Sequence, residues 1–450
     1  MTISPLDLGE SERPLTGWGR TTPTVASVKA VTNVADIQDV VQHASPRGVL
    51  ARGLGRSYGD AAQSGGGTLV DLSSLDYAHI DHEAGLVTAG AGASLDALLR
   101  TLVPAGFFVP VTPGTRMVTV GGAIAADIHG KNHHVEGTFG SHVSSLTLVD
   151  GQGELRTLTP DSPLFWATIG GMGLTGVITE ATFDLIPITT SLMSVDTNRT
   201  TDLDDAMSRM IEGDDAYRYS VTWIDSISPS GRGVMTRGDH ATLDQLPLGT
   251  PALAYGPQPR LTAPSMIPGA LLNTLSVRAF NAAWFRKAPK HRVAELQSIP
   301  AFFHPLDGVL EWNRIYGRGG FLQYQFVVPD NAAHVVPYAL KRLRDIGAPS
   351  FLTVLKRFGA ANPAPLSFPQ PGWTLTADVP ARIAGLADVL DELDTLVLSE
   401  GGRLYLAKDS RMSPAMMASS YPRLAEWQEQ RTQLDPHHVF TSDLARRLSL

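Results

Sequence analysis

Three glycine-rich segments lie in the N-terminal part of the chain, and such segments can bind phosphate through backbone amides. They are ARGLGRSYGD (51–60), TPGTRMVTVGGAIAADIHGKNHH (112–134) and IGGMGLTGVI (169–178). Glycine lets N–H groups approach a phosphate closely and adopts positive φ without strain. The alternative is that these are turns without a ligand, because the chain has 43 glycines to place. Three such loops, each beside a short predicted strand, favour a site for a pyrophosphate-bearing cofactor.

The third segment also matches the G-x-G-x-x-G pattern, at residues 171–176. A Rossmann nucleotide site needs a strand before this pattern and a helix after it. Here VITEATFDLIPI (177–188) follows, and its β-branched, alternating character predicts a strand. We therefore reject a Rossmann site. No Walker lysine follows any of the three segments either.

Other reactive groups are absent from the sequence or wrongly arranged. The chain has no cysteine, which excludes disulfides, thiolate metal sites, cysteine nucleophiles and cysteine-linked cofactors. His129, His133, His134 and His142 lie close together, but no carboxylate pattern accompanies them, so we predict no metal site. No G-x-S-x-G elbow is present, which argues against a hydrolase of that type.

Composition limits the classes of partner. At 450 residues with 43% hydrophobic content, the chain is expected to form a globular protein of two domains. A net charge of −8 argues against general nucleic-acid binding, which needs a concentrated basic face. We find no signal peptide at the N-terminus and no apolar run long enough to span a bilayer. Any membrane contact is therefore expected to be peripheral.

The elements that must position the glycine-rich segments are short. Strands are predicted at 49–52, 68–72 and 85–89, a hairpin at 146–158, and helices at 34–41 and 95–102. Ser94 is the expected N-cap of the second helix. This is an α+β pattern, with many strands and few long helices. The strand at 49–52 runs directly into the first glycine-rich segment.

We predict two domains with a boundary near residue 190. Residues 1–190 form the cofactor domain, 191–402 form a substrate domain, and 403–450 return to a helical pattern and complete the first domain. The proline-rich, apolar stretch 251–275 has two interpretations. It is an ordinary surface loop, or a mobile loop over an apolar substrate or at a membrane surface.

The order of the three segments, with Asp435-Pro436 and Phe440 near the end, resembles the vanillyl-alcohol-oxidase (FAD-linked oxidase) superfamily. The resemblance implies a two-domain FAD-binding fold whose substrate domain is built on an antiparallel sheet. Covalent members of that superfamily carry a histidine just before Ser-Tyr. Arg56 occupies this position here, and arginine cannot form the histidyl–flavin bond, so the resemblance implies noncovalent FAD.

The same resemblance implies which residues contact FAD. They come from the three glycine-rich segments and from a tyrosine near the C-terminus. These residues are Arg52, Gly53, Leu54, Gly55, Arg56, Ser57, Tyr58, Gly59, Asp60, Gly114, Thr119, Val120, Gly121, Gly122, Ala126, Asp127, Ile128, His129, Gly130, Ile178 and Tyr405.

Four further strings narrow the resemblance to one branch of the superfamily. HGKNHH (129–134), HPLDGVLEWNR (304–314), FLQYQFVVP (321–329) and RLYLAKDSR (403–411) closely resemble flavin oxidases of decaprenylphosphoryl ribose. These oxidise the ribose 2′-hydroxyl as one subunit of an epimerase that serves cell-wall arabinan synthesis. The branch implies a lipid-linked sugar as substrate, a separate NADH-dependent keto-reductase as partner, and a place at the cell envelope, on the periplasmic side or membrane-associated. Residues 240–300 match least well.

The branch also implies catalytic roles for Lys408, Tyr405 and His129. Lys408 would act as a base or bind the anionic reduced ring, because burial beside a flavin lowers a lysine pKa. Its alternative is a solvated lysine, although YLAKDS flanks it with apolar residues. Tyr405 would face the flavin and the sugar, and His129 would touch the ring or the sugar.

Substrate contacts are implied for residues from several segments. Gln323 and Gln325 are two residues apart in a predicted strand, so their amides share one face and suit sugar hydroxyls, unless that face is exposed. Lys131 and Lys356 are expected to meet phosphate. Tyr316 and Trp223 are candidates whose alternative role is packing. Thr374 and Thr376 complete the predicted set.

Thr376 marks a departure from the mycobacterial members of this branch. They carry a cysteine at this position, beside the flavin ring. The resemblance does not assign that cysteine an essential part in hydride transfer, so the catalytic prediction is unchanged. Sensitivity to inhibitors that bond covalently to the thiol is expected to be lost.

Two alternatives to this function remain open from the sequence. One is a soluble alditol or sugar oxidase that passes its electrons directly to oxygen. The other is a nonenzymatic flavin- or lipid-binding partner in an envelope complex, which the presence of Lys408, Tyr405, Gln323 and Gln325 disfavours.

Overall fold

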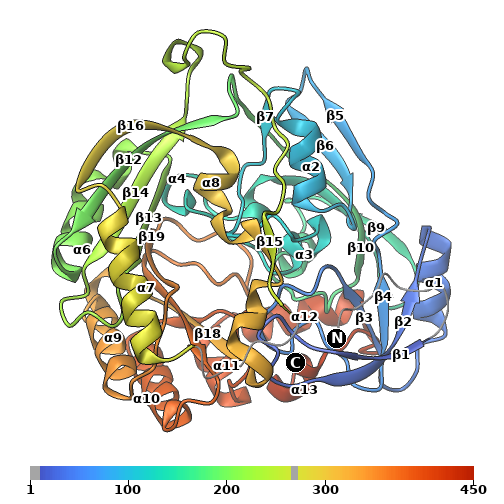
Figure 1. Ribbon diagram of the computed structural model, residues 1–450. Coiled ribbons are helices and arrows are strands. Elements are labelled where there is room, and N and C mark those ends of the chain that lie inside the picture. Colours follow the sequence, from blue (N-terminus) through green and yellow to red (C-terminus); the bar gives the residue numbers. More distant parts are fainter. Residues whose placement is uncertain (1–10, 265–271) are drawn as a thin grey trace.

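The computed structural model describes residues 11–264 and 272–450 (Figure 1). Two sheets come from the N-terminal part of the chain. The first has the strand order β1 (Ser11–Leu15), β2 (Thr24–Ala30), β4 (Thr68–Asp71), β3 (Val49–Arg52). The second has the order β5 (Ala78–Asp81), β6 (Leu86–Gly90), β10 (Val177–Asp184), β8 (Val143–Val149), β9 (Leu155–Leu158).

Most local predictions for this part are confirmed. Helix α1 (Val34–Gln42) and helix α2 (Leu95–Leu102) form where the apolar spacing predicts them, and Ser94 accepts a hydrogen bond from the Ala97 N–H at the start of α2. Strands β8 and β9 form the predicted antiparallel hairpin. Strand β10 follows the third glycine-rich segment, so the rejection of a Rossmann site is confirmed.

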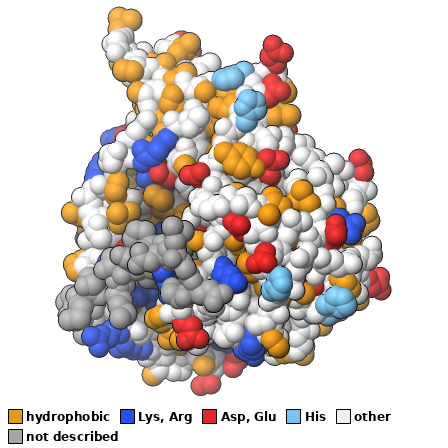
Figure 2. Space-filling model, turned by 90° about the vertical axis from the view of Figure 1, so that its right-hand side faces the viewer, with side chains coloured by type: hydrophobic (Ala, Val, Ile, Leu, Met, Phe, Trp, Pro, Cys, Tyr) orange, Lys and Arg blue, Asp and Glu red, His pale blue; other side chains and the backbone are white. Residues whose placement is uncertain are grey.

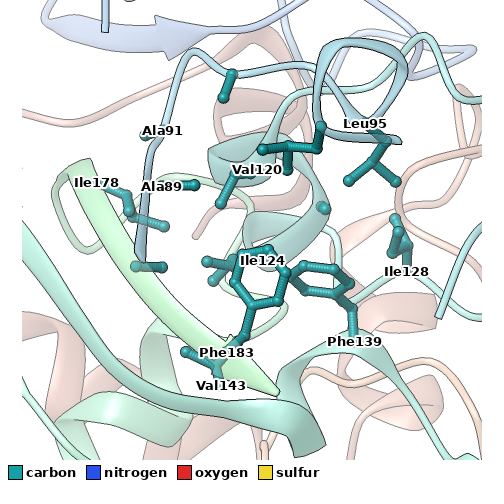
Figure 3. Close-up of a cluster of buried hydrophobic side chains, with 14 of the residues drawn as sticks. Ala89, Ala91, Leu95, Val120, Ile124, Ile128, Phe139, Val143, Ile178 and Phe183 are labelled. Carbon is teal, nitrogen blue, oxygen red and sulfur yellow. The ribbon is translucent and has the colours of Figure 1, made fainter. Parts of the chain in front are cut away.

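The second glycine-rich segment is fixed by the hydrophobic core (Figure 3). Helix α3 (Val120–Ala125) begins at Thr119, whose hydroxyl accepts a hydrogen bond of 3.2 Å from the Gly122 N–H. Its side chains Val120 and Ile124 are fully buried against the strands of the second sheet, near Phe183. This packing turns the glycine backbone of α3 toward the opposite side.

The C-terminal part of the fold is one large sheet. All of its pairings are antiparallel, as the resemblance implied, and the α+β fold class is confirmed. Its strand order is β16 (His291–Ser298), β12 (Leu192–Thr200), β14 (Gly233–His240), β13 (Tyr219–Ile224), β19 (Thr353–Phe358), β20 (Gly372–Pro380), β18 (Phe321–Val328), β21 (Arg403–Leu404). Helices α6 (Leu203–Gly213), α9 (Val335–Asp345) and α10 (Leu386–Ser399) pack their buried side chains on one face of this sheet.

The last helices return to the N-terminal part of the molecule. They are α11 (Pro414–Ser420), α12 (Leu424–Leu434) and α13 (Asp443–Leu448). Trp427 of α12 is fully buried and donates a 2.9 Å hydrogen bond to the Ala167 carbonyl, at helix α5 (Pro163–Thr168). Asp435 accepts hydrogen bonds from the N–H groups of Val439 and Phe440, which orders the end of the chain beside β3. The exact domain limits at 190 and 402 stay a prediction.

The segment 251–275 is only partly described, since residues 265–271 lie outside the described ranges. Strand β15 (Leu261–Thr262) pairs in parallel with β17 (Val309–Leu310), and helix α7 (Thr274–Lys287) follows. The chain between β14 and β15 projects from the top of the molecule, and the projection carries hydrophobic side chains on its surface (Figures 1 and 2). Over residues 11–264 and 272–450, no helix is both long and apolar enough to cross a membrane.

Candidate functional site

A cavity of about 900 Å³ lies between the glycine-rich segments and the large sheet. All three segments contribute to one wall, with Gly53, Gly121 and Gly173 among the lining residues. The opposite wall is the face of the sheet that α6, α9 and α10 leave free. This volume is at the upper end of the range for ligand sites in proteins.

Because glycine has no side chain, the glycine-rich segments present backbone peptide groups on this wall of the cavity. A Cβ at Gly53 would lie 2.3 Å from the Thr119 hydroxyl oxygen, so a larger residue would have to displace the side chain that caps α3. Gly55 has φ of +63°, a conformation that favours glycine. A Cβ at Gly114 would meet nothing within 4 Å. The wall therefore offers open space and peptide groups, which fits the pyrophosphate of FAD.

Most of the residues predicted to bind the cofactor line this cavity. They are Arg52, Gly53, Leu54, Gly55, Arg56, Ser57, Tyr58, Gly114, Thr119, Gly121, Gly122, Ala126, Ile128, His129, Gly130, Ile178 and Tyr405. The guanidinium of Arg56 stacks 3.9 Å from the Trp18 ring centroid, so both residues stand at the cavity wall. Trp18 was missing from the predicted set, and its isolated position in the sequence gave no signal.

Four predicted cofactor residues do not line the cavity. Val120 is fully buried in the core beneath α3, and Gly59 packs so closely on the Asp409 carbonyl that a Cβ would lie 1.8 Å from it. Asp60 is engaged by Arg447 in an ion pair of 2.7 Å. Asp127 is fully buried and accepts hydrogen bonds from the Gly140 N–H and two side chains. These residues support the cavity wall from behind.

The sheet face that floors the cavity changes in character from one side to the other. Its β18 side is polar, where Gln325 lies opposite Thr376 in the strand register and Lys356 follows on β19. Toward β13 and β14 the floor becomes mainly apolar. There it is lined by Val354, Trp223, Val221 and Val234, with Thr236 beside them. Beyond these strands, Glu295 and Gln297 of β16 also line the cavity. The Trp223 indole N–H donates 2.9 Å to the Phe351 carbonyl, which fixes that ring in the floor.

Gln325 is held in one orientation by a chain of hydrogen bonds. The Thr374 hydroxyl donates to the Phe326 carbonyl at 2.8 Å, so its oxygen accepts from the Gln325 amide at 3.3 Å. The second Gln325 N–H then faces Nε2 of His129 at 3.1 Å. Burial, then nearby lysines and His133, hold the pKa of His129 well below its usual range. A neutral His129 that accepts at Nε2 carries its proton on Nδ1.

Lys408 lies at the polar end of the cavity. Its ammonium sits 3.7 Å from the Tyr58 ring centroid. Burial lowers the pKa of Lys408 to about 7, with Asp378 opposing that effect and Lys356 adding to it. A lysine in this state can take up or release a proton near neutrality.

Lys131 and Lys356 form a second cationic group in the cavity. Burial and then repulsion by Lys356 lower the pKa of Lys131 to about 7, and burial lowers that of Lys356 to about 8. The Lys131 ammonium donates to the Phe302 carbonyl and stands 4.1 Å from the Phe302 ring centroid. In the described ranges neither lysine has a carboxylate partner, so an anionic group between them would relieve their repulsion.

The other predicted residues occupy three different positions. The Tyr405 hydroxyl donates to the Ala126 carbonyl at 2.9 Å, which ties the cavity wall to the second segment. Tyr316 does not line the cavity and stacks on Phe321 with ring centroids 4.0 Å apart, which is packing. Thr374 lies beneath Gln325 and supports it. The described residues also contain no group of three or more His, Asp or Glu that could hold a metal ion.

Comparison with known proteins identifies the family. Residues 25–159 match the family described as FAD binding domain. The chain is 47% identical to decaprenylphosphoryl-beta-D-ribose oxidase of Mycolicibacterium smegmatis, over 100% of both chains. This chain belongs to the decaprenylphosphoryl-ribose oxidase family. It is also 39% identical to an uncharacterized protein of Streptomyces coelicolor, over 79% of this chain and 100% of that protein.

Membership of the decaprenylphosphoryl-ribose oxidase family settles the class of chemistry. The protein is an FAD-dependent oxidoreductase with a vanillyl-alcohol-oxidase type of fold, as the sequence indicated. An alditol oxidase of a Streptomyces species is similar at the lower level of 26% identity, over 96% of this chain and 98% of that protein.

Proposed function

We propose that the protein oxidises the ribose 2′-hydroxyl of decaprenylphosphoryl ribose to the 2′-keto sugar. This proposal rests on the residues that line the floor of the cavity. It also rests on the similarity of the whole chain to a decaprenylphosphoryl-beta-D-ribose oxidase. Its polar end carries the amides of Gln323 and Gln325, and its apolar end suits an isoprenoid chain. A separate NADH-dependent keto-reductase would complete epimerisation toward decaprenylphosphoryl arabinose.

Residues of this chain would bind the flavin and leave it free to react. The glycine-rich wall would hold the pyrophosphate, and Tyr58, Tyr405 and Lys408 would lie beside the ring system. Bound FAD supplies the hydride acceptor. Arg56 stands where covalent relatives carry histidine, and the chain has no cysteine, so the flavin is held without a covalent bond.

The alcohol proton would be taken by Lys408. Above about pH 7 its amine is largely neutral and can act as a base. His129 is a poor alternative, because its Nε2 already accepts from Gln325 and its Nδ1 is buried. Lys131 and Lys356 would bind the phosphate, and the amides of Gln323 and Gln325 would orient the sugar.

The deciding experiment is anaerobic mixing of the FAD-loaded protein with a polyprenyl-phosphoryl ribose while flavin absorbance is followed. Rapid bleaching, with the keto sugar recovered, is the expected result. A flavin that stays oxidised with this lipid but bleaches with a free alditol would assign the protein as an alditol oxidase instead. A protein that takes up no FAD would contradict the entire proposal.

We further propose that the protein works at the cell envelope, with the cavity mouth beside α7 against a membrane. Phe280, Trp284 and Lys287 line the cavity, yet Phe280 is 48% exposed and Trp284 42%, so the cavity opens here. Residues 272–298 contain five Lys and Arg but one Glu, in a chain of net charge −8. Exposed aromatic rings with surrounding cations suit the surface of an anionic bilayer.

Replacing both Phe280 and Trp284 with alanine is expected to weaken binding to vesicles of anionic phospholipid by about 10-fold or more, because two large apolar side chains are removed. Co-sedimentation measures this. The KM for the lipid-linked substrate should rise, whereas bleaching by a short-chain, water-soluble analogue should change little. Leu155→Ala is the matched control, since Leu155 is 51% exposed and does not line the cavity. If the Phe280/Trp284 double variant bound the vesicles as well as Leu155→Ala does, α7 would not be the surface that contacts the membrane.

A further inference from the structure

Asp378 is a buried carboxylate directly behind the polar end of the cavity. It lies on β20 opposite Gln323 of β18 in the strand register, and it is fully inaccessible to solvent. Gln323 lines the cavity, whereas Asp378 does not. Asp378 therefore cannot touch a ligand in the cavity, but it contacts a residue that can.

The hydrogen bond between Gln323 and Asp378 has a defined donor and acceptor. Nε2 of Gln323 donates a hydrogen bond to Oδ1 of Asp378. An ionised carboxylate only accepts hydrogen bonds, so it requires the amide nitrogen on its own side. The carbonyl oxygen is on the other branch of the same planar group and is left for a ligand. Gln323 then offers the cavity an acceptor.

We propose that Asp378 is a positioning residue that turns the carbonyl oxygen of Gln323 toward a hydroxyl of the substrate. The identity of that hydroxyl rests on the proposed function, but the orientation of the amide does not. A protonated Asp378 has both a donor and an acceptor, so it can pair with either end of the Gln323 amide. Only the ionised state of Asp378 therefore enforces one orientation of Gln323.

The surroundings of Asp378 make both states accessible near neutrality. Burial raises the pKa of Asp378 to about 7, against the opposing effects of the Gln323 hydrogen bond, the Lys408 charge and the Tyr316 hydrogen bond. Tyr316 from the 3₁₀ helix Trp312–Gly319 interacts with the Asp378 carboxylate. Tyr58 from the first glycine-rich segment also faces this carboxylate and interacts with the Gln323 side chain.

Gln325 provides an internal comparison. Its amide nitrogen is occupied by Thr374 and His129, and no carboxylate contacts it within the described ranges. Its orientation is therefore not tied to the protonation of an acid. Of Gln323 and Gln325, only Gln323 is hydrogen-bonded to a carboxylate among the described residues.

A double-mutant cycle on the FAD-loaded protein tests the inference. Asp378→Asn removes the charge at constant shape and is expected to lower kcat/KM by about 10-fold, mainly through KM, as the loss of one well-placed hydrogen bond would. In a Gln323→Ala background the same change should cost less than about 3-fold, because nothing remains to be oriented. Equal losses in both backgrounds would overturn the proposal. Asp150→Asn is the control, because Asp150 is a fully buried carboxylate at the turn between β8 and β9 and does not line the cavity.

A second measurement needs no turnover. In protein labelled with ¹⁵N-glutamine, the Gln323 side-chain amide signal can be assigned by its loss in Gln323→Ala. It should shift as pH passes through about 7 in the wild type and not in Asp378→Asn. If the chemical shift of this signal did not change with pH in the wild type, the proposal would be overturned, even if Asp378→Asn failed to fold. If the protein oxidises a different alcohol, the proposed function fails but the cycle can be measured with that alcohol.

Discussion

Replacing Lys408 with methionine is expected to lower the rate of flavin reduction by ~10²–10⁴-fold, the usual contribution of a positioned base. Methionine keeps much of the length and apolar contact of lysine but cannot accept a proton. Stopped-flow bleaching under anaerobic conditions measures the rate. The wild-type rate should also rise as pH increases through about 7, because the Lys408 amine loses its proton over that range. That rise should be missing in the variant.

Lys356→Met is the matched control for this prediction. Lys356 is equally buried in the same cavity, but the proposal gives it a phosphate rather than a proton. Its loss should raise KM for the lipid phosphate and leave the maximal bleaching rate nearly unchanged. If Lys408→Met retained the wild-type rate, or if both variants lost it equally, the role of base would belong to another group.

The second large effect concerns stability. Asp127→Ala is expected to lower the free energy of unfolding by about 3 kcal/mol or more, because it leaves buried donors without an acceptor. Asp127 accepts from the Gly140 N–H at 3.0 Å, from Asn362 at 2.8 Å and from the Ser367 hydroxyl. It thereby joins the second glycine-rich segment to residues far along the chain. FAD retention should fall with stability.

Denaturant unfolding followed by tryptophan fluorescence measures the effect, and flavin absorbance after gel filtration reports retention. Asp81→Ala is the control, because Asp81 accepts from the N–H groups of Glu83 and Ala84 in an exposed turn, where water replaces it. We expect less than about 1 kcal/mol there. A variant at Asp127 as stable as the Asp81 variant would show that the buried network contributes little.

Much of the fold followed from local patterns in the sequence. Ser94 and the leucines of α2 marked a capped amphipathic helix, and the β-branched alternation after residues 171–176 was enough to exclude a Rossmann site. Such signals depend only on residues that are close together in the sequence. They can therefore be recognised in a single sequence.

The residues of the site were harder to predict, because their contacts depend on the pairing of strands that are far apart in the sequence. Asp378 was missed, although it continues the alternation of Thr374 and Thr376 along β20, because only the register with β18 brings it to Gln323. Val120 was predicted to contact FAD from its place in a glycine-rich motif. Its side chain points to the core, since the helix that begins at Thr119 needs one buried face. Motif membership does not distinguish the two sides of a helix.

The opening of the cavity beside α7 has a consequence for how the enzyme would meet its substrate. A lipid entering there leads with its sugar and leaves its chain toward the mouth, where Phe280 and Trp284 stand. Substrate capture then takes place in two dimensions. Saturation would depend on the mole fraction of the lipid within the membrane and not on its concentration in the bulk. Dilution with inert lipid at constant total substrate would slow the enzyme.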